Sequence, residues 1–84
     1  MSLNEIEVQV LLFASARECV GTARLTQMLP AGASVGDLAA RLYDAYPGLQ
    51  DLRLRFAVNA AYSNLEAELY DGDELACIPP VGGG

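Results

Sequence analysis

Apolar and polar side chains alternate along residues 6–13 (IEVQVLLF), the pattern of a strand with one buried face. One face carries only apolar residues: Ile6, Val8, Val10 and Leu12. The following ASAREC can form a short helical turn closed by Gly21, and residues 22–29 (TARLTQML) read as a second strand. We expect the two strands to pair antiparallel.

A helix is predicted after the loop PAGA. Ser34 and Asp37 have the spacing of a capping box, and Pro47 and Gly48 should end the helix. Apolar residues between these signals fall on one helical stripe: Val35, Leu38, Ala39, Leu42 and Tyr46. This stripe should cover one face of the sheet, with Tyr43 and Tyr46 in the core and at its rim.

Further strands are predicted at 55–60 (RFAVNA), in a short AYS segment and at 74–78 (ELACI), with DGD at 71–73 as the turn before the last strand. This order of elements predicts an α+β fold in which a mixed sheet of four to five strands packs on one main helix, the β-grasp or ubiquitin-like arrangement. Residues 1–80 should form a single domain, and residues 81–84 a flexible glycine-rich C-terminal tail.

The charge of the chain restricts its partners. Five arginines and eleven acidic residues give a formal net charge of −6, and no basic cluster occurs. A nucleic-acid partner is therefore not expected, and a protein with a basic surface fits better. No apolar stretch approaches the roughly 20 residues of a membrane span, and the N-terminus lacks a signal peptide pattern. We expect a cytoplasmic protein that does not contact a membrane.

Few side chains offer catalytic chemistry. The chain has no histidine, which argues against Ser-His-Asp triads, and it has no lysine for a Schiff base. Cys19 and Cys77 lack C-x-x-C spacing, so we expect buried free thiols and no metal. Asp71, Asp73 and Glu74 lack the spacing of a calcium loop and indicate a charged turn. Any chemistry is therefore not expected to start on a side chain.

The C-terminal sequence PPVGGG suits a projecting stem. In the β-grasp arrangement the last strand is central, and the chain leaves it at one end of the sheet. Proline stops strand pairing, and the four residues after Pro80 can reach roughly 13 Å when extended. Glycine has no Cβ, so the walls of a narrow slot can approach its backbone. A carboxylate on this stem could enter such a slot.

Several motifs together resemble one family. FASARECVG at 13–21 is similar to the Phe-Ala-x-x-Arg-Glu-x-x-Gly stretch of the molybdopterin synthase small subunit, the MoaD-type ubiquitin-like sulfur carriers. AVN, DGDEL and PPV recur in that family's order and spacing, so the resemblance covers nearly the whole chain. Arg17 and Glu18 match the motif, although a solvated turn explains them better than a direct role.

The resemblance implies a sulfur carrier without catalytic groups of its own and without a bound cofactor. In this family an activating enzyme uses ATP to adenylate the terminal glycine, here Gly84, and sulfur then replaces AMP. The thiocarboxylate tail, with Gly82 and Gly83, enters the large subunit of molybdopterin synthase. There the sulfur passes to the pterin precursor in molybdenum cofactor biosynthesis.

A docking surface is expected beside the tail. Because Leu75 and Cys77 should point inward, Ile78 should lie on the face away from the helix, as should Phe13 if Leu12 is buried. The hydrophobic contact patch of the family maps onto Phe13, Tyr62 and Ile78. The expected partner-binding residues are these three with the base of the tail: Pro79, Pro80 and Val81. Alternatively, the loops of the chain itself cover these side chains.

Other functions remain open. Many family members carry Ser or Thr where this chain has Gly82, and a Gly-Gly-Gly ending also occurs in the thiamine sulfur carriers. Those carriers are usually shorter and lack the FAxxRE stretch, which favours the molybdenum pathway. A ubiquitin-like carrier for cysteine or tRNA thiolation is a further alternative, and an interaction module with a disordered glycine tail is another.

Overall fold

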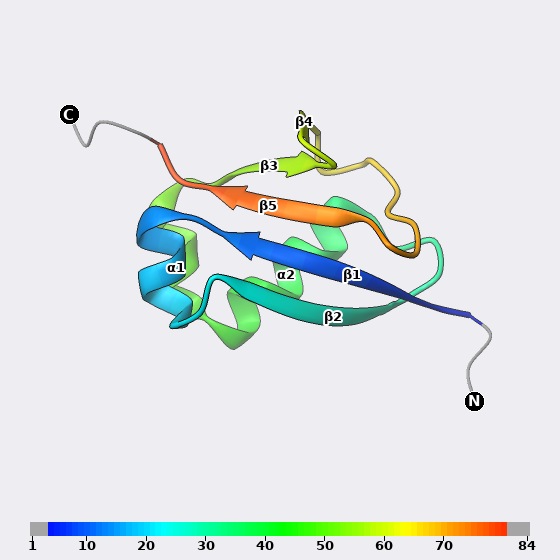
Figure 1. The fold of residues 1–84 in the computed structure, drawn as a ribbon, viewed down its shortest axis with the longest axis horizontal. Coiled ribbons are helices and arrows are strands. Elements are labelled where there is room, and N and C mark those ends of the chain that lie inside the picture. Colours follow the sequence, from blue (N-terminus) through cyan, green and yellow to red (C-terminus); the bar gives the residue numbers. More distant parts are fainter. Residues whose placement is uncertain (1–3, 81–84) are drawn as a thin grey trace.

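The computed structural model describes residues 4–80, which form a five-stranded sheet with one main helix across one face (Figure 1). The strands are β1 (Glu5–Leu12), β2 (Arg24–Pro30), β3 (Arg55–Val58), β4 (Ala61–Tyr62) and β5 (Glu74–Ile78). The helices are α1 (Ala14–Val20), α2 (Val35–Ala45) and the 3₁₀-helix η1 (Pro47–Leu52).

The sheet has the order β2-β1-β5-β3-β4. Strand β1 pairs parallel with β5, and the other neighbours pair antiparallel, including β1 with β2 as predicted. The last strand is therefore central in a mixed sheet, as the β-grasp prediction requires. The predicted tail at 81–84 lies outside the described residues.

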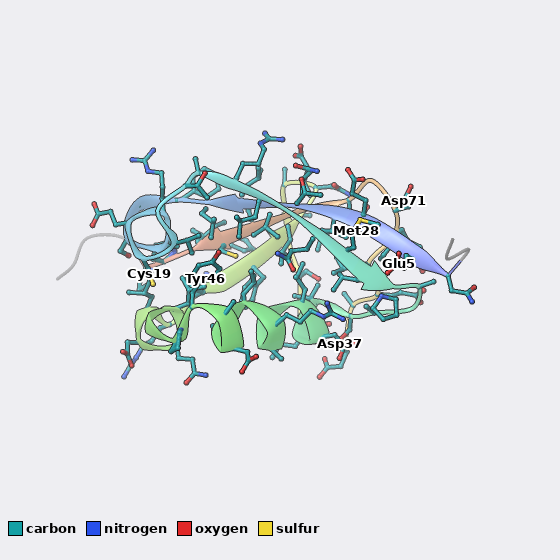
Figure 2. All side chains as sticks on the ribbon, turned by 90° about the horizontal axis from the view of Figure 1, so that it is seen from below. Glu5, Cys19, Met28, Asp37, Tyr46 and Asp71 are labelled. Carbon is teal, nitrogen blue, oxygen red and sulfur yellow. The ribbon has the colours of Figure 1, made fainter. Side chains whose placement is uncertain are left out.

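The core lies between the sheet and α2, which form the two layers seen in Figure 2. Strand β1 buries every second residue, and the four apolar residues predicted for one face are all buried. Leu75 and Cys77 of β5 continue this buried row in the neighbouring strand. Each fully buried apolar side chain contributes about 1.5–3 kcal/mol to folding.

Helix α2 begins with the predicted capping box. The Ser34 Oγ accepts a hydrogen bond from the Asp37 N–H (3.1 Å), and the Ser34 N–H donates to Asp37 Oδ2 (2.9 Å). The predicted stripe is buried except for Tyr46, which is half-buried at the C-terminal end. Pro47 ends α2 and also begins η1, a helix that the sequence analysis did not predict. Proline suits the first turn of a helix because its missing N–H would have no intrahelical partner there.

The predicted strand 55–60 is shorter in the structure, because β3 ends at Val58 and a two-residue turn leads to β4. Asn59 and Ala60 both have positive φ, at 49° and 72°. Type I′ hairpin turns require positive φ at both central residues. The Asn59 side chain also binds β5 and the turn before it, because its Oδ1 accepts from the Glu74 N–H and its Nδ2 donates to Asp73 Oδ1 (3.0 Å each).

The DGD segment forms the predicted turn and anchors it to β1. The Glu7 N–H donates to Asp71 Oδ1 (2.7 Å), and the Gly72 N–H donates back to the Glu7 carbonyl oxygen (2.8 Å). Asp73 Oδ2 accepts from the Tyr70 N–H (2.8 Å), and Gly72 has φ 87°. These carboxylates therefore hold the chain where it enters β5 beside β1.

The prediction of two buried thiols is confirmed for Cys77 and wrong for Cys19. Cys77 is buried, but Cys19 is exposed, because the short helix α1 buries only Ala16. Gly21 closes this helix as predicted, with φ 95°. Burial raises the pKa of the Cys77 thiol to about 12, so it is a poor nucleophile at neutral pH. Within residues 4–80, no helix has the length and apolar character to cross a membrane.

Candidate functional site: the open face of the sheet

The face of the sheet opposite α2 contains an apolar hollow of about 320 Å³. Side chains alternate between the two faces of a strand, so the neighbours of the buried Leu12, Phe56 and Cys77 point to this open face. The hollow is lined by Leu11, Phe13, Ala57, Ala60, Tyr62, Glu74, Ala76 and Ile78.

Small side chains form the centre of the hollow. Ala57 of β3 and Ala76 of β5 are direct partners in the sheet. Larger apolar side chains, including Phe13, Tyr62 and Ile78, surround these two alanines. The surface is therefore hollowed where the small alanine side chains lie between the larger ones. Exposed apolar surface of this kind commonly marks a protein interface.

Phe13 lies where β1 ends and α1 begins. Its backbone is extended (φ −116°, ψ 150°), and its carbonyl oxygen accepts from the Ala16 and Arg17 N–H groups at 2.9 and 3.3 Å. These bonds fix the first turn of α1 while the Phe13 side chain stays 48% exposed beside the hollow. Arg17 and Glu18 are exposed on α1, in keeping with a solvated position.

Tyr62 and Ile78 also line the hollow. Tyr62 pairs with Ala57 in the register of β3 and β4 and is 62% exposed. Ile78 is the last residue of β5 and is half-buried. The structure thus brings the three residues of the predicted patch to one hollow, and the loops in the described part of the chain leave Phe13 and Tyr62 open. Their binding to a partner stays a prediction.

The base of the tail directly follows this hollow. Pro79 is buried and Pro80 is exposed, while Val81, Gly82, Gly83 and Gly84 lie outside the described residues. The partner contacts predicted for Pro79 and Pro80 stay predictions. The hollow extends over β5 from Glu74 to Ile78. The chain leaves β5 from the Ile78 end, next to α1 (Figure 1).

Charged side chains stand at the edge of the hollow. The guanidinium carbon of Arg55 lies 4.2 Å from the centre of the Tyr62 ring, within the range of a cation–π interaction. Glu74 lines the hollow at the beginning of β5. Arg55 was not among the residues predicted for the site, although its position opposite Ile78 follows once the strand register is known.

The described residues show no arrangement typical of a catalytic centre. Within residues 4–80, no group of three Cys, Asp or Glu side chains is placed to hold a metal ion. Asp71 and Asp73 accept hydrogen bonds within their turn, and Cys77 is buried with a raised pKa. Within residues 4–80, these two carboxylates and this thiol are therefore engaged in the fold.

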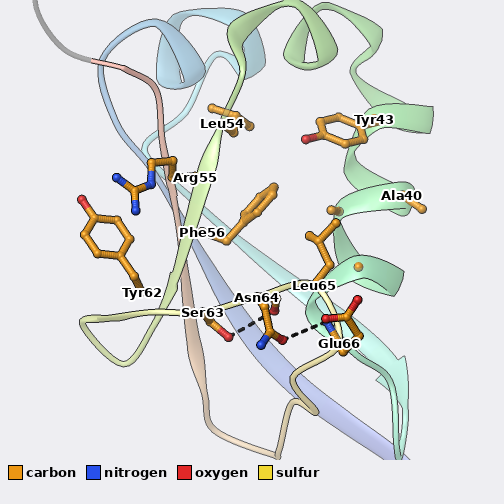
Figure 3. Close-up of a pocket in the computed structure, with 12 residues that line it drawn as sticks. Ala40, Tyr43, Leu54, Arg55, Phe56, Tyr62, Ser63, Asn64, Leu65 and Glu66 are labelled. Carbon is orange, nitrogen blue, oxygen red and sulfur yellow. Dashed lines mark hydrogen bonds between the residues drawn. The ribbon is translucent and has the colours of Figure 1, made fainter.

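A larger hollow, of about 610 Å³, lies between α2 and the segment after β4 (Figure 3). Tyr43, Phe56 and Leu65 contribute apolar surface to it. The polar groups of its loop bond to one another, because the Ser63 Oγ donates to the Asn64 carbonyl oxygen (3.2 Å) and Asn64 Oδ1 accepts from the Glu66 N–H (3.1 Å). Arg55 and Tyr62 also line this hollow, so it meets the smaller one at Tyr62. We do not assign it to the site, because it opens toward α2 and is not on the open face of the sheet.

Comparison with known proteins identifies relatives over nearly the full chain. Residues 10–84 match the ThiS family. The molybdopterin synthase sulfur carrier subunit of Mycobacterium tuberculosis is 43% identical, with 94% of this chain and 99% of that protein covered. The protein of the same name from Arabidopsis thaliana is 37% identical, with coverage of 96% and 86%.

Solved structures show the same arrangement. The putative molybdopterin converting factor, subunit 1, from Pyrococcus furiosus has a TM-score of 0.83 at 30% identity, covering 90% of this chain and 99% of that one. The small archaeal modifier protein 1 from Methanosarcina acetivorans has a TM-score of 0.80 at 31% identity, with coverage of 95% and 98%. A chain in the complex of subunits 1 and 2 of molybdopterin-converting factor from Helicobacter pylori has a TM-score of 0.65 at 28% identity, with coverage of 94% and 100%.

Proposed function

The chain belongs to the ThiS family, and from this premise we propose that it is the sulfur carrier subunit of a molybdopterin synthase. In this proposal Gly84 carries the sulfur as a C-terminal thiocarboxylate. The observation that carries the proposal is that the apolar hollow extends along β5 to Ile78, from which the chain continues into the sequence PPVGGG. A partner that binds this hollow would also receive the chain end.

The chemistry begins at a carboxylate. A bare carboxylate is a poor electrophile because its negative charge repels a nucleophile and no good leaving group is present. Adenylation by ATP converts the Gly84 carboxylate into an acyl adenylate with release of pyrophosphate, and a sulfur nucleophile at the oxidation level of sulfide then displaces AMP. The C–O bond to AMP breaks as the C–S bond forms. ATP is used by an activating enzyme, and this chain contributes the carboxylate and the surface that docks.

The partner in sulfur transfer is the large subunit of the synthase. Subunits 1 and 2 of molybdopterin-converting factor form a protein–protein complex in Helicobacter pylori, which supports a two-subunit assembly for this chain as well. General acids and bases would come from the large subunit, because this chain has no histidine or lysine. The cytoplasmic location expected from the sequence belongs to the same proposal.

Mass spectrometry of the protein isolated from its host tests the carrier role. We expect a species heavier than the free carboxylate form by the mass difference between sulfur and oxygen, localised to the C-terminal peptide. A peptide with only the carboxylate, isolated from cells that make molybdenum cofactor, would contradict the proposal. Covalent adducts between Gly84 and other proteins would instead support a modifier role, which the likeness to the archaeal modifier protein favours.

Copurification from the host identifies the pathway. A pterin-binding large subunit retained with the chain is the expected result. Retention of a thiazole synthase instead would transfer the assignment to thiamine biosynthesis, the alternative suggested by the Gly-Gly-Gly ending. The parent protein and a variant with the hollow disrupted by Phe13→Asp should be compared, so that nonspecific retention is recognised.

A further inference from the structure

Arg55 is an exposed cation on the proposed docking face. It is the first residue of β3 and pairs with Ile78, the last residue of β5. Phe56, the next residue, is buried toward α2, so Arg55 points to the opposite, open face. Figure 3 shows Arg55 beside Tyr62, with Phe56 on the side of β3 that faces α2.

The Arg55 guanidinium lies over the ring of Tyr62. Their separation of 4.2 Å allows the planar guanidinium to interact with the ring face. Within the described part of the chain, no carboxylate or carbonyl oxygen accepts a hydrogen bond from this guanidinium. Its N–H groups are therefore exposed to solvent and accessible to an acceptor on a partner.

Acidic and basic side chains lie toward opposite ends of the open face. Glu7 and Glu74 lie toward the end where β1 and β5 begin, whereas Arg24, opposite Leu11, and Arg55 lie toward the end where β5 stops. The chain has a net charge of −6, so cations on this face beside residues that line the hollow are unusual for it. A partner with the complementary order of charges would bind in one orientation, because the reversed orientation would bring like charges together.

We propose that Arg55 determines the specificity of docking by forming an ion pair with a carboxylate of the large synthase subunit at the edge of the hollow, and that Tyr62 positions its guanidinium for this contact. A carboxylate is the acceptor that suits an arginine best, because two parallel N–H···O bonds match its two oxygens. The inference rests on the function proposed above and adds the chemistry of the partner surface. It also gives Tyr62 a second role besides its apolar contact.

Calorimetric titration with the large subunit tests the ion pair. Arg55→Glu should weaken binding at least about tenfold, and Arg55→Lys should weaken it less, because lysine keeps the charge but loses the planar fork. Arg41→Glu is the matched control. It makes the same change in charge on α2, away from the open face, where Arg41 only donates to the Met28 carbonyl oxygen at 3.4 Å. Its binding constant should stay within about twofold of the parent value.

A double-mutant cycle tests the role of Tyr62. Tyr62→Leu keeps apolar surface but removes the ring, so the loss caused by Arg55→Glu should be smaller in the Tyr62→Leu background than in the parent. Additive losses would overturn the positioning role of Tyr62. High salt should reduce the difference between the parent and Arg55→Glu, since a charged contact at an interface edge is screened.

The outcomes distinguish a failure of the Arg55 ion pair from a failure of the proposed carrier function. If the parent binds the large subunit and Arg55→Glu binds equally well, the ion pair is overturned while the carrier function stands. If Arg41→Glu weakens binding as much as Arg55→Glu, net charge and not a local contact is responsible, which also overturns the ion pair. A parent that does not bind the large subunit would overturn the carrier function and this inference with it.

Discussion

At the scale of single residues, Asn59 accounts for a motif that the sequence analysis recognised only by resemblance. Asn59 tolerates a positive φ better than most residues, and its side chain bonds both to Asp73 and to the backbone of Glu74. The AVN motif therefore closes the hairpin and attaches it to β5. The sequence signal was present, because asparagine favours such turns, but Ala60 in place of the usual glycine concealed the turn.

Ala60→Gly should stabilise the protein. Ala60 has φ 72°, a conformation that strains a side chain and that glycine adopts freely. We expect the free energy of unfolding in urea to rise by about 0.5–1 kcal/mol, because relief of strain outweighs the greater chain entropy of the unfolded state. Ala61→Gly in β4 is the control and should destabilise, since glycine weakens a strand. A loss of stability for Ala60→Gly would contradict the assignment of strain.

The two thiols should differ in reactivity. Cys19 is exposed and Cys77 is buried, so a thiol reagent at neutral pH should label one site in the folded protein and both sites in denaturant. Rapid labelling of Cys77 in the folded protein would show that the centre of the sheet opens readily.

The raised pKa of Cys77 should make the stability depend on pH. The thiol is protonated in the folded state up to about pH 12 but ionises near 9.0 when unfolded. Its contribution is therefore full below pH 9 and is lost as the pH rises toward 12. The difference in unfolding free energy between the parent and Cys77→Val should move in favour of the variant above pH 9. A difference independent of pH would contradict the burial of the thiol.

At the scale of elements, hydrophobic periodicity together with helix-capping and turn motifs predicted most of the fold. The alternation in β1, the capping box of α2 and the turn at 71–73 each follow from short stretches of sequence whose meaning does not depend on distant residues. Helix η1 and the end of β3 were not predicted. Leu49 of η1 is buried where η1 contacts α1 and α2, and a six-residue segment is too short to show a period.

Leu38→Ala and Leu42→Ala should each cost about 2–5 kcal/mol of stability, because both side chains are buried between α2 and the sheet. Arg41→Ala on the exposed side of the same helix is the control and should change stability by about 0.5 kcal/mol or less. Urea unfolding measures all three. Losses for both leucines as small as that of the control would mean that α2 does not pack on the sheet through this stripe.

At the scale of the whole molecule, the structure places an apolar hollow along β5, and the chain leaves this strand at the Ile78 end of the hollow. The alternation of side chains between the two faces of a strand was enough to predict that Phe13 and Ile78 share the open face. The remaining lining, including Ala57, Ala76 and the neighbouring Arg55, depends on which residues pair across strands. Residues far apart in sequence meet through that register, and no pattern within a single strand reveals it.

Phe13→Asp should weaken binding to the large subunit with little loss of stability. The side chain is 48% exposed and lines the hollow, so a carboxylate there is tolerated in water but disfavoured in a desolvated interface. Tyr70→Asp is the control, because Tyr70 is 60% exposed and does not line the hollow. Calorimetric titration should show a loss of at least about tenfold for Phe13→Asp alone. Equal affinity for both folded variants would remove the hollow from the interface.

The central claim is that sulfur is delivered from the end of this chain, and single-turnover transfer tests it most directly. The protein is thiocarboxylated chemically at its C-terminus, mixed with the large subunit and the pterin precursor, and product formation is followed. The parent should transfer sulfur, whereas deletion of Gly84 moves the reactive group back by about 3.3–3.6 Å and should abolish transfer. Gly83→Val should also fail, because a β-branched side chain does not fit a slot that accepts bare backbone. Transfer by all three proteins at equal rates would contradict the claim that the position and the slender backbone of the C-terminal glycines determine delivery.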